Sequence, residues 1–251
     1  MTKHQYIINW LKKYSKTSGI NTFVVGVSGG IDSALTSTLC AMTGKPTILL
    51  SMPIHQGSEE LDRARNHMRW LGEHHPNVTC VEYDLTDVYD SFASMFGDEP
   101  NPLALANSRA RLRMTTLYQV AQEHKGLVVG TGNKVEDFGV GFYTKYGDCG
   151  VDISPIADLY KSEVRELATE LNISDSILSA QPTDGLWSDG RTDEDQIGAT
   201  YDELEAVMKK HWEKGSMTER QTKVTEIYKR LHMQNQHKMN PIPVCKMYEE
   251  R

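Results

Sequence analysis

The part of the chain best suited to chemistry is a loop rich in glycine and serine. It runs through Gly26, Val27, Ser28, Gly29, Gly30, Ile31, Asp32 and Ser33. Glycines let backbone N–H groups approach an anion, serine hydroxyls add donors, and a helix starting here would point the positive end of its dipole at the anion. The loop therefore predicts a phosphate site. A simpler alternative is a strand-to-helix turn in which Asp32 and Ser33 are ordinary first-turn residues.

Asp32, the acidic residue inside this loop, and the order of the loop glycines indicate which kind of ligand would bind. The loop has neither the G-x-x-x-x-G-K-[ST] pattern of Walker A proteins nor the G-x-G-x-x-G pattern of dinucleotide folds, so another class of nucleotide-binding protein is indicated. The carboxylate of Asp32 would repel a phosphate unless a divalent cation bridges the two. The sequence thus favours a nucleotide bound together with a magnesium ion.

The elements that must position this loop alternate between strands and helices. Short apolar runs predict strands, and helical spacing of apolar residues predicts helices. The strands are expected over 22–27, 47–52, 78–85 and 127–130, and the helices over 1–16, 33–40, 59–73, 107–123, 159–171, 201–211 and 218–233. Buried strands interleaved with helices imply an α/β fold: an open parallel sheet covered on both faces, with ligands outside the carboxyl ends of the strands.

Length and composition limit the possible functions. The chain has 251 residues, which fits one domain over 1–251, and its net charge of −7 argues against a general nucleic-acid surface. No stretch approaches membrane-spanning length, and we expect a cytoplasmic protein. Four cysteines lie far apart and form no C-x-x-C pair, so neither a zinc site nor a disulfide scaffold is indicated.

The segment S-G-G-I-D-S resembles the signature loop of the N-type ATP pyrophosphatases, which cleave ATP between its α and β phosphates. The rest of the chain resembles one branch of that superfamily, the NAD synthetases, over nearly its whole length. The resemblance implies an adenine nucleotide alpha-hydrolase-like fold. It also implies a ligase that uses ATP and ammonia to amidate deamido-NAD through an acyl adenylate, giving NAD, AMP and pyrophosphate.

The resemblance also implies roles for residues around ATP. The segment G-T-G-N-K-V-E over 130–136 is similar to the family's G-T-x-N-K-x-E, in which the threonine contacts ATP and the glutamate binds magnesium. Thr131 is thus expected at ATP, and Glu136 with Asp32 at the metal. Lys161, at the start of a predicted helix, and Thr183 match further ATP ligands. Asp32 and Lys161 are the residues expected to carry catalysis.

A second set of residues is implied for the deamido-NAD substrate. The run F-Y-T-K-Y-G-D over 142–148 resembles the family's F-x-T-K-Y-G-D, which places Lys145 and Asp152 on the dinucleotide. The helix N-S-R-A-R-L-R-M over 107–114 resembles one that contributes Arg111, although three arginines at alternate positions cannot share one helix face. His237 and Lys238, in the tail 237–251, match a dipeptide that completes the site, often across a homodimer.

Three further expectations concern the reaction cycle and its alternatives. The polar segment 181–196 has the Pro/Gly content of a mobile loop and is expected to act as a lid. The chain has no room for the amidase domain of glutamine-dependent relatives, so free ammonia or a separate partner is expected as the nitrogen source. The alternatives are another ATP pyrophosphatase, such as a tRNA-thiolating or GMP-forming ligase, or a nucleotide-binding module without turnover.

Overall fold

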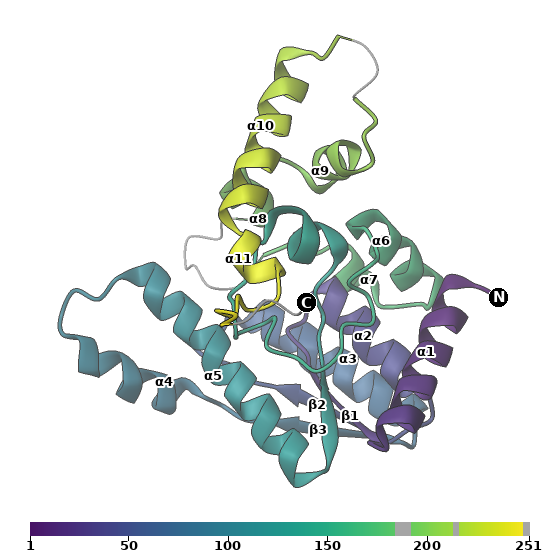
Figure 1. The fold of residues 1–251 in the computed structure, drawn as a ribbon. Coiled ribbons are helices and arrows are strands. Elements are labelled where there is room, and N and C mark those ends of the chain that lie inside the picture. Colours follow the sequence, from purple (N-terminus) through teal and green to yellow (C-terminus); the bar gives the residue numbers. More distant parts are fainter. Residues whose placement is uncertain (184–191, 213–215, 248–251) are drawn as a thin grey trace.

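The computed structural model describes residues 1–183, 192–212 and 216–247. Strands and helices alternate through the first half, and the second half is almost entirely helical (Figure 1). The strands are β1 (Thr22–Gly26), β2 (Thr47–Ser51), β3 (Val78–Glu82) and β4 (Gly126–Val129). The helices are α1 (Lys3–Ser18), α2 (Ile31–Ala41), α3 (Ser58–His74), α4 (Thr86–Ala93), η1 (Ser94–Phe96), α5 (Pro102–Glu123), η2 (Val135–Val140), α6 (Lys161–Glu170), α7 (Asp175–Leu178), α8 (Asp193–Ile197), α9 (Tyr201–Met208), α10 (Glu219–Gln234) and α11 (Gln236–Met239).

The four strands form one parallel sheet in the order β3-β2-β1-β4. A single parallel bridge between Val129 and Ile153 extends the sheet beyond β4. Parallel strands need crossover connections, and α2, α3 and α5 supply them between successive strands. The predicted open parallel α/β sheet is confirmed, and its carboxyl edge receives the loops after β1, β2 and β4.

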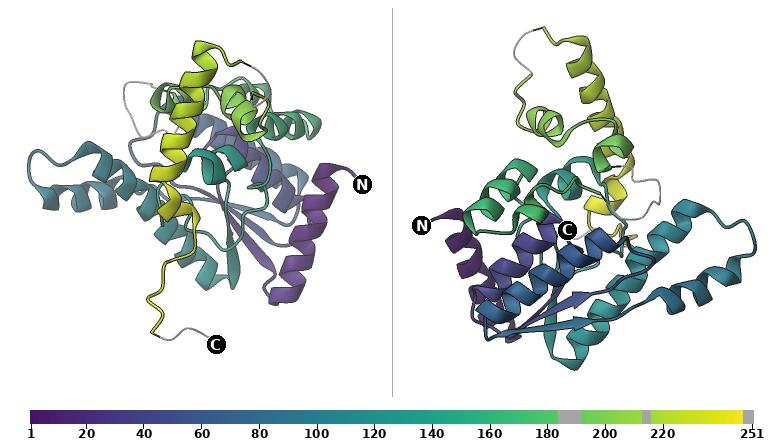
Figure 2. Two further views of the ribbon diagram at one scale, coloured as in Figure 1. Left: turned by 45° about the horizontal axis from the view of Figure 1, so that its top comes forward. Right: turned by 180° about the vertical axis from the view of Figure 1, so that it is seen from behind.

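Helices cover both faces of the sheet because strand residues alternate between two separate cores. Phe23 and Val25 of β1 face a core shared with α1, α2, α3 and α6, whereas Val24 between them faces a core shared with α4 and α5. The two views of Figure 2 show α1, α2 and α3 on one side of the strands and α5 on the other. The sheet is therefore the middle layer of a three-layer fold.

A third apolar cluster lies outside the sheet and joins η2 to α8, α9 and α10. Its largest fully buried side chain is Tyr201, at the first turn of α9, which packs in the same cluster as Val135, Leu204 and Val224. The helices α9 and α10 form a pair that projects beyond the carboxyl edge of the sheet (Figure 1). This cluster places η2, which carries Glu136, between the sheet and the projecting helices.

The elements depart from the sequence-based bounds where local capping decides the boundary. α5 begins at Pro102, five positions before the predicted start, since Asn101 caps it by accepting the N–H of Ala104 at 3.1 Å and proline suits a first helical turn. The strand predicted over 78–85 ends at Glu82. The chain then turns into α4, a helix that the sequence-based prediction missed. Within the described residues, no helix is long and apolar enough to span a membrane.

Candidate active site

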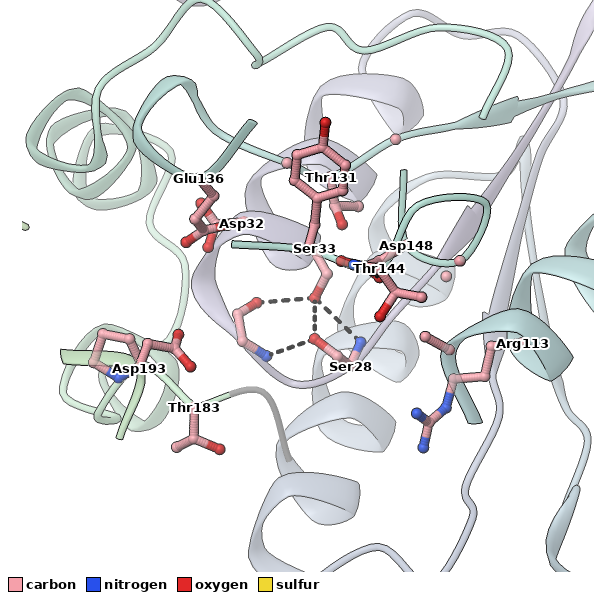
Figure 3. Close-up of a pocket in the computed structure, with 18 of the residues that line it drawn as sticks. Ser28, Asp32, Ser33, Arg113, Thr131, Glu136, Thr144, Asp148, Thr183 and Asp193 are labelled. Carbon is pink, nitrogen blue, oxygen red and sulfur yellow. Dashed lines mark hydrogen bonds between the residues drawn. The ribbon is translucent and has the colours of Figure 1, made fainter. Parts of the chain in front are cut away.

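The glycine–serine loop joins β1 to α2 at the carboxyl edge of the sheet and is held by its own hydrogen bonds (Figure 3). The hydroxyl of Ser33 donates to the Gly30 carbonyl at 2.9 Å and accepts the N–H of Ser28 at 3.2 Å. The hydroxyl of Ser28 lies 3.1 Å from that of Ser33 and accepts the N–H of Gly30 at 3.2 Å. The loop is therefore a preformed turn at the N-terminus of α2, where an anion is favoured.

A glycine is required at one point of this loop. Gly29 has a φ of 87°, and a Cβ atom there would lie 2.3 Å from the backbone carbonyl oxygen of Glu60 in α3. Neither the backbone conformation nor the space accommodates a side chain. The close approach of the loop to α3 thus accounts for this glycine independently of any ligand.

A buried cluster of charges lies beside the loop. The Nζ atom of Lys161 is 2.5 Å from Oδ2 of Asp32 and 3.1 Å from Oε1 of Glu136, so one ammonium group bridges two carboxylates. Asn133 links Asp32 to the start of η2. Its Nδ2 donates to Oδ1 of Asp32 at 3.2 Å, and its Oδ1 accepts the N–H of Val135 at 3.0 Å. Three residues singled out in the sequence are thus brought together from α2, η2 and α6.

The protonation of this cluster follows from burial and mutual charge. Burial raises the pKa of Asp32, against the opposing effect of Lys161. Burial would also raise the pKa of Glu136, but Lys161 and the hydroxyl of Tyr201 outweigh it and the pKa is lowered. Burial opposes the charge of Lys161, yet the two carboxylates raise its pKa above the usual lysine range. Lys161 is therefore a permanent cation at this position.

A cavity of about 530 Å³ connects the loop and the charged cluster to the segment after η2. The predicted ATP-site residues that line it are Gly26, Val27, Ser28, Gly30, Ile31, Asp32, Ser33, Thr131, Lys161 and Thr183, together with Glu136. Gly29 is not among the lining residues because its backbone packs against α3. Thr183 is the last described residue before the gap at 184–191, and its hydroxyl donates to Glu60 at 3.1 Å. Residues 184–191, half of the predicted lid 181–196, lie outside the described residues.

The other end of the cavity is lined by residues of α5 and of the segment 141–151. In Figure 3, Arg113 lies on the same side as Thr144 and Asp148, across the serine loop from Thr183. Arg113 donates to the Met52 carbonyl at 2.9 Å and to Oε1 of Gln56 at 3.4 Å, both neutral acceptors. Burial lowers the pKa of Arg113 to about 10. A cation held in this way suits an anionic ligand.

Acidic groups and a thiol occupy the wall between the two ends of the cavity. Cys149 donates to Oδ1 of Asp137 at 3.4 Å, and burial raises the pKa of this thiol far above its usual value. Burial also raises the pKa of Asp137 to about 7 and that of Asp148 to about 6. A thiol that stays protonated is a poor nucleophile, which agrees with leaving Cys149 out of the predicted catalytic residues.

The residues predicted to hold the dinucleotide are spread more widely. Among them, Lys238 lines the cavity; it donates to the carbonyls of Gly141 at 2.8 Å and Tyr143 at 2.7 Å. Lys145 donates to the backbone carbonyl of His237, so the tail packs on the F-Y-T-K-Y-G-D segment of its own chain. Arg111 is exposed and donates to the carbonyl of Lys145 at 3.2 Å.

Asp152 is exposed, and its carboxylate is held by hydrogen bonds to β4 and α5. It accepts the N–H of Val128 at 2.8 Å and the hydroxyl of Tyr118 at 3.1 Å. The residues lining the cavity do not include Arg111, Lys145, Asp152 or His237. Their assignment to the dinucleotide stays a prediction.

Several residues in and around the cavity were not predicted as site residues, among them Asn133, Arg113, Asp148 and Tyr201. Asn133 and Asp148 lie inside the segments 130–136 and 142–148, so the sequence motifs could have indicated them as site residues. Arg113 is one of three alternate arginines, and only the packing of α5 on β1 and β4 shows that it faces the cavity. Tyr201 looks like an ordinary helical core residue in the sequence.

A parallel α/β sheet with a glycine–serine loop, paired carboxylates and a buried lysine at its carboxyl edge defines a nucleotide-binding enzyme class. The sequence matches the family described as NAD synthase over residues 3–248. The chain belongs to the NAD synthase family.

Individual relatives agree with this assignment. An NH(3)-dependent NAD(+) synthetase from Carboxydothermus hydrogenoformans is 34% identical over 94% of this chain and 93% of its own length. A solved NMN synthetase from Francisella tularensis has a TM-score of 0.88 and 31% identity, with 98% of both chains covered. The NH3-dependent NAD synthetase from Campylobacter jejuni has a TM-score of 0.78 and 26% identity, covering 97% of this chain and 98% of that one.

Proposed function

We infer that this chain is a C–N bond-forming ligase that amidates deamido-NAD with ammonia at the expense of ATP, giving NAD, AMP and pyrophosphate. The observation that carries the inference is the family match over almost the whole chain, combined with a cavity that joins the phosphate loop to the Asp32–Lys161–Glu136 cluster. The family match favours this reaction over a tRNA-thiolating or GMP-forming ligase. A binding module without turnover would not need the paired carboxylates.

The residues around the cluster suit a magnesium ion. Asp32 and Glu136 present hard carboxylate oxygens, and a cationic group already lies between them in the form of the Lys161 ammonium. Among the described residues no group of three or more His, Cys, Asp or Glu side chains could hold a metal alone. Two carboxylates fill only part of the octahedral shell of magnesium, so phosphate oxygens and water would complete it, and the ion would neutralise phosphate charge there.

The chain's own residues account for the rest of the reaction. The backbone N–H groups and hydroxyls of the loop bind the phosphates, and Thr131 and Thr183 add hydroxyls at its sides. Lys161 moves onto the phosphates and balances their charge while the nicotinate carboxylate attacks the α phosphorus and pyrophosphate leaves. Ammonia then displaces AMP from the acyl adenylate. Positioning and charge neutralisation suffice, and no protein nucleophile is required.

The deciding experiment supplies the purified protein with deamido-NAD, MgATP and ammonium, and omits one component at a time. NAD and AMP should form only when all are present. ATP cleavage to AMP and pyrophosphate with a different acceptor would keep the enzyme class and refute the substrate. Glutamine in place of ammonium should give no product, and efficient use of glutamine by the pure protein would refute ammonia as the nitrogen source.

A second substrate is favoured by one specific observation. The NMN synthetase matches this chain with a higher TM-score and identity than the Campylobacter NAD synthetase does. Nicotinate mononucleotide is the acyl-bearing half of deamido-NAD, so the same activation and amidation would convert it to NMN. The ratio of kcat/KM for the two substrates decides between them: a value for the mononucleotide at least tenfold higher would make NMN the product.

We also propose that the protein acts as a homodimer. The arm formed by α4, η1 and the start of α5 projects from the sheet (Figure 1) and exposes large apolar side chains. They are Val88, Met95, Phe96 and Leu103. Exposed apolar groups on a projecting element fit a subunit contact. Light scattering on the eluting protein should give twice the mass of the 28.3 kDa chain, and a monomer at micromolar concentration would refute the proposal.

A further inference from the structure

Tyr201 reaches the charged cluster from a distant part of the chain. It is the first residue of α9, its side chain is fully buried, and its hydroxyl lies 2.6 Å from Oε1 of Glu136. The same hydroxyl lies 3.3 Å from Oδ2 of Asp193. A hydroxyl has one hydrogen to donate, so the shorter contact to Glu136 is the hydrogen bond and Asp193 is the weaker alternative acceptor.

The position of the Tyr201 ring is fixed independently of Glu136. The ring packs in the apolar cluster with Leu204 and Val224, and the Nζ atom of Lys161 lies 4.7 Å from its centre. The backbone of Tyr201 is held too, because its N–H donates to Glu194 at 3.0 Å. The hydroxyl is therefore delivered to the cluster by a rigid, close-packed side chain.

Glu136, by contrast, lies on an irregular element. η2 is a single π-helical segment, a conformation that is rare and common at functional sites. The other strong partner of Oε1 is Lys161, at 3.1 Å, which must leave the carboxylates when it serves the phosphates of ATP. Tyr201 is then the donor that remains.

We propose that Tyr201 is a positioning residue, whose hydroxyl holds the Glu136 carboxylate in place to bind the divalent cation that accompanies ATP. The proposal rests on the proposed function, because it takes Glu136 as a ligand of that cation. A donor that orients a metal-binding carboxylate typically changes metal affinity about 10- to 100-fold when it is removed. A tyrosine that only fills the core would affect stability and leave metal affinity unchanged.

The test measures metal binding without turnover. The probe is Mn2+, followed by electron paramagnetic resonance, with the full chain saturated by α,β-methylene ATP, which cannot be cleaved between its α and β phosphates. Tyr201→Phe keeps the ring and removes the hydroxyl, and the Kd for Mn2+ should rise about 10-fold or more. Binding of the nucleotide in EDTA should stay within twofold of the wild-type value.

Tyr228→Phe is the matched control. Tyr228 packs against the same apolar cluster and stacks on His232 with ring centres 5.5 Å apart, so this change removes a hydroxyl from the same core. The control should leave the Kd for Mn2+ unchanged. If Tyr201→Phe also leaves it within twofold of wild type, the proposal is overturned, whatever happens to Tm.

A third variant separates this proposal from the function on which it rests. Glu136→Gln should weaken Mn2+ binding at least as much as Tyr201→Phe does in the same assay. If Glu136→Gln weakens Mn2+ binding and Tyr201→Phe does not, the metal site stands and only the positioning role fails. If neither change affects Mn2+ binding, Glu136 is not a metal ligand and the metal assignment itself fails.

Discussion

The ammonium group of Lys161 lies 2.5 Å from a carboxylate oxygen of Asp32, and both side chains are largely shielded from solvent. Glu136 shares the same ammonium at 3.1 Å. In this state the lysine neutralises the two carboxylates that would hold a divalent cation. The proposed function therefore requires an exchange, in which Lys161 transfers from the carboxylates to the phosphates when the metal and ATP bind.

Lys161→Met should therefore be less stable than the wild type in EDTA and should regain stability with Mg2+. Removing one partner of a buried ion pair costs about 3–5 kcal/mol because the remaining charge stays buried. In the variant, Mg2+ can take the place of the ammonium, so millimolar Mg2+ should raise its Tm by several degrees and the wild-type Tm much less. Lys209→Met is the control. Lys209 lies outside the cluster, and its Nζ atom is 2.9 Å from Oε2 of Glu205. An Mg2+-insensitive Tm in Lys161→Met would contradict the exchange.

Gly29→Ala should disrupt the phosphate loop. The left-handed conformation costs a non-glycine residue about 1–2 kcal/mol, and the new Cβ would lie 2.3 Å from the backbone oxygen of Glu60. The variant should lose at least this much stability in urea unfolding, and its KM for ATP should rise more than tenfold. Gly30→Ala is the comparison for stability, since its φ is −88° and its Cβ would meet only the Ser28 hydroxyl at 3.4 Å. Equal destabilisation by Gly29→Ala and Gly30→Ala would contradict a specific requirement for glycine at position 29.

The sequence predicted the sheet and the glycine–serine turn after β1 because both depend on contiguous residues. Apolar strand runs and helical spacing are local patterns, and Ser28 to Ser33 form their turn through bonds within the loop itself. The contribution of Tyr201 was not predictable in this way. It depends on α9 and η2 packing together, and in the sequence a buried helical tyrosine resembles any other core residue.

The arginines of α5 are a second case in which the sequence could not show which side chain faces the site. The spacing indicated that only one or two of them could face a ligand, but which arginine does so depends on how α5 packs on β1 and β4. In the structure, Arg113 lines the cavity and contacts the Met52 carbonyl, whereas Arg111 lies exposed. The family pattern had singled out Arg111, and a comparison of the two variants tests both assignments.

Arg113→Met should raise the KM of an anionic substrate about tenfold or more. The guanidinium faces the cavity with neutral hydrogen-bond acceptors, so its charge is available to a phosphate or carboxylate. Arg111→Ala should weaken the binding of the pyridine nucleotide more than the binding of ATP if the family-based assignment is right. Steady-state kinetics with each substrate varied separately provides the measurement. Unchanged KM values in Arg113→Met would show that Arg113 does not bind a substrate and only contacts Met52 and Gln56.

A buried histidine that does not line the cavity should set part of the acid sensitivity of the fold. His67 lies in α3, and its Nε2 is 3.0 Å from the Ser37 hydroxyl and 3.1 Å from the Ala34 carbonyl. Burial lowers its pKa to about 4. In the unfolded chain its pKa is about 6.5, so below that pH the unfolded state binds a proton that the folded state refuses.

The stability that His67 contributes is therefore present above pH 6.5 and is lost as the pH falls towards 4. Between pH 7 and pH 5 the loss from this residue should be about 2 kcal/mol. His67→Gln keeps a hydrogen-bond donor that cannot be protonated, and its free energy of unfolding should fall by about 2 kcal/mol less than that of the wild type over the same interval. Urea unfolding at both pH values measures the difference. Parallel losses in the two proteins would show that His67 accepts its proton equally well in the folded state.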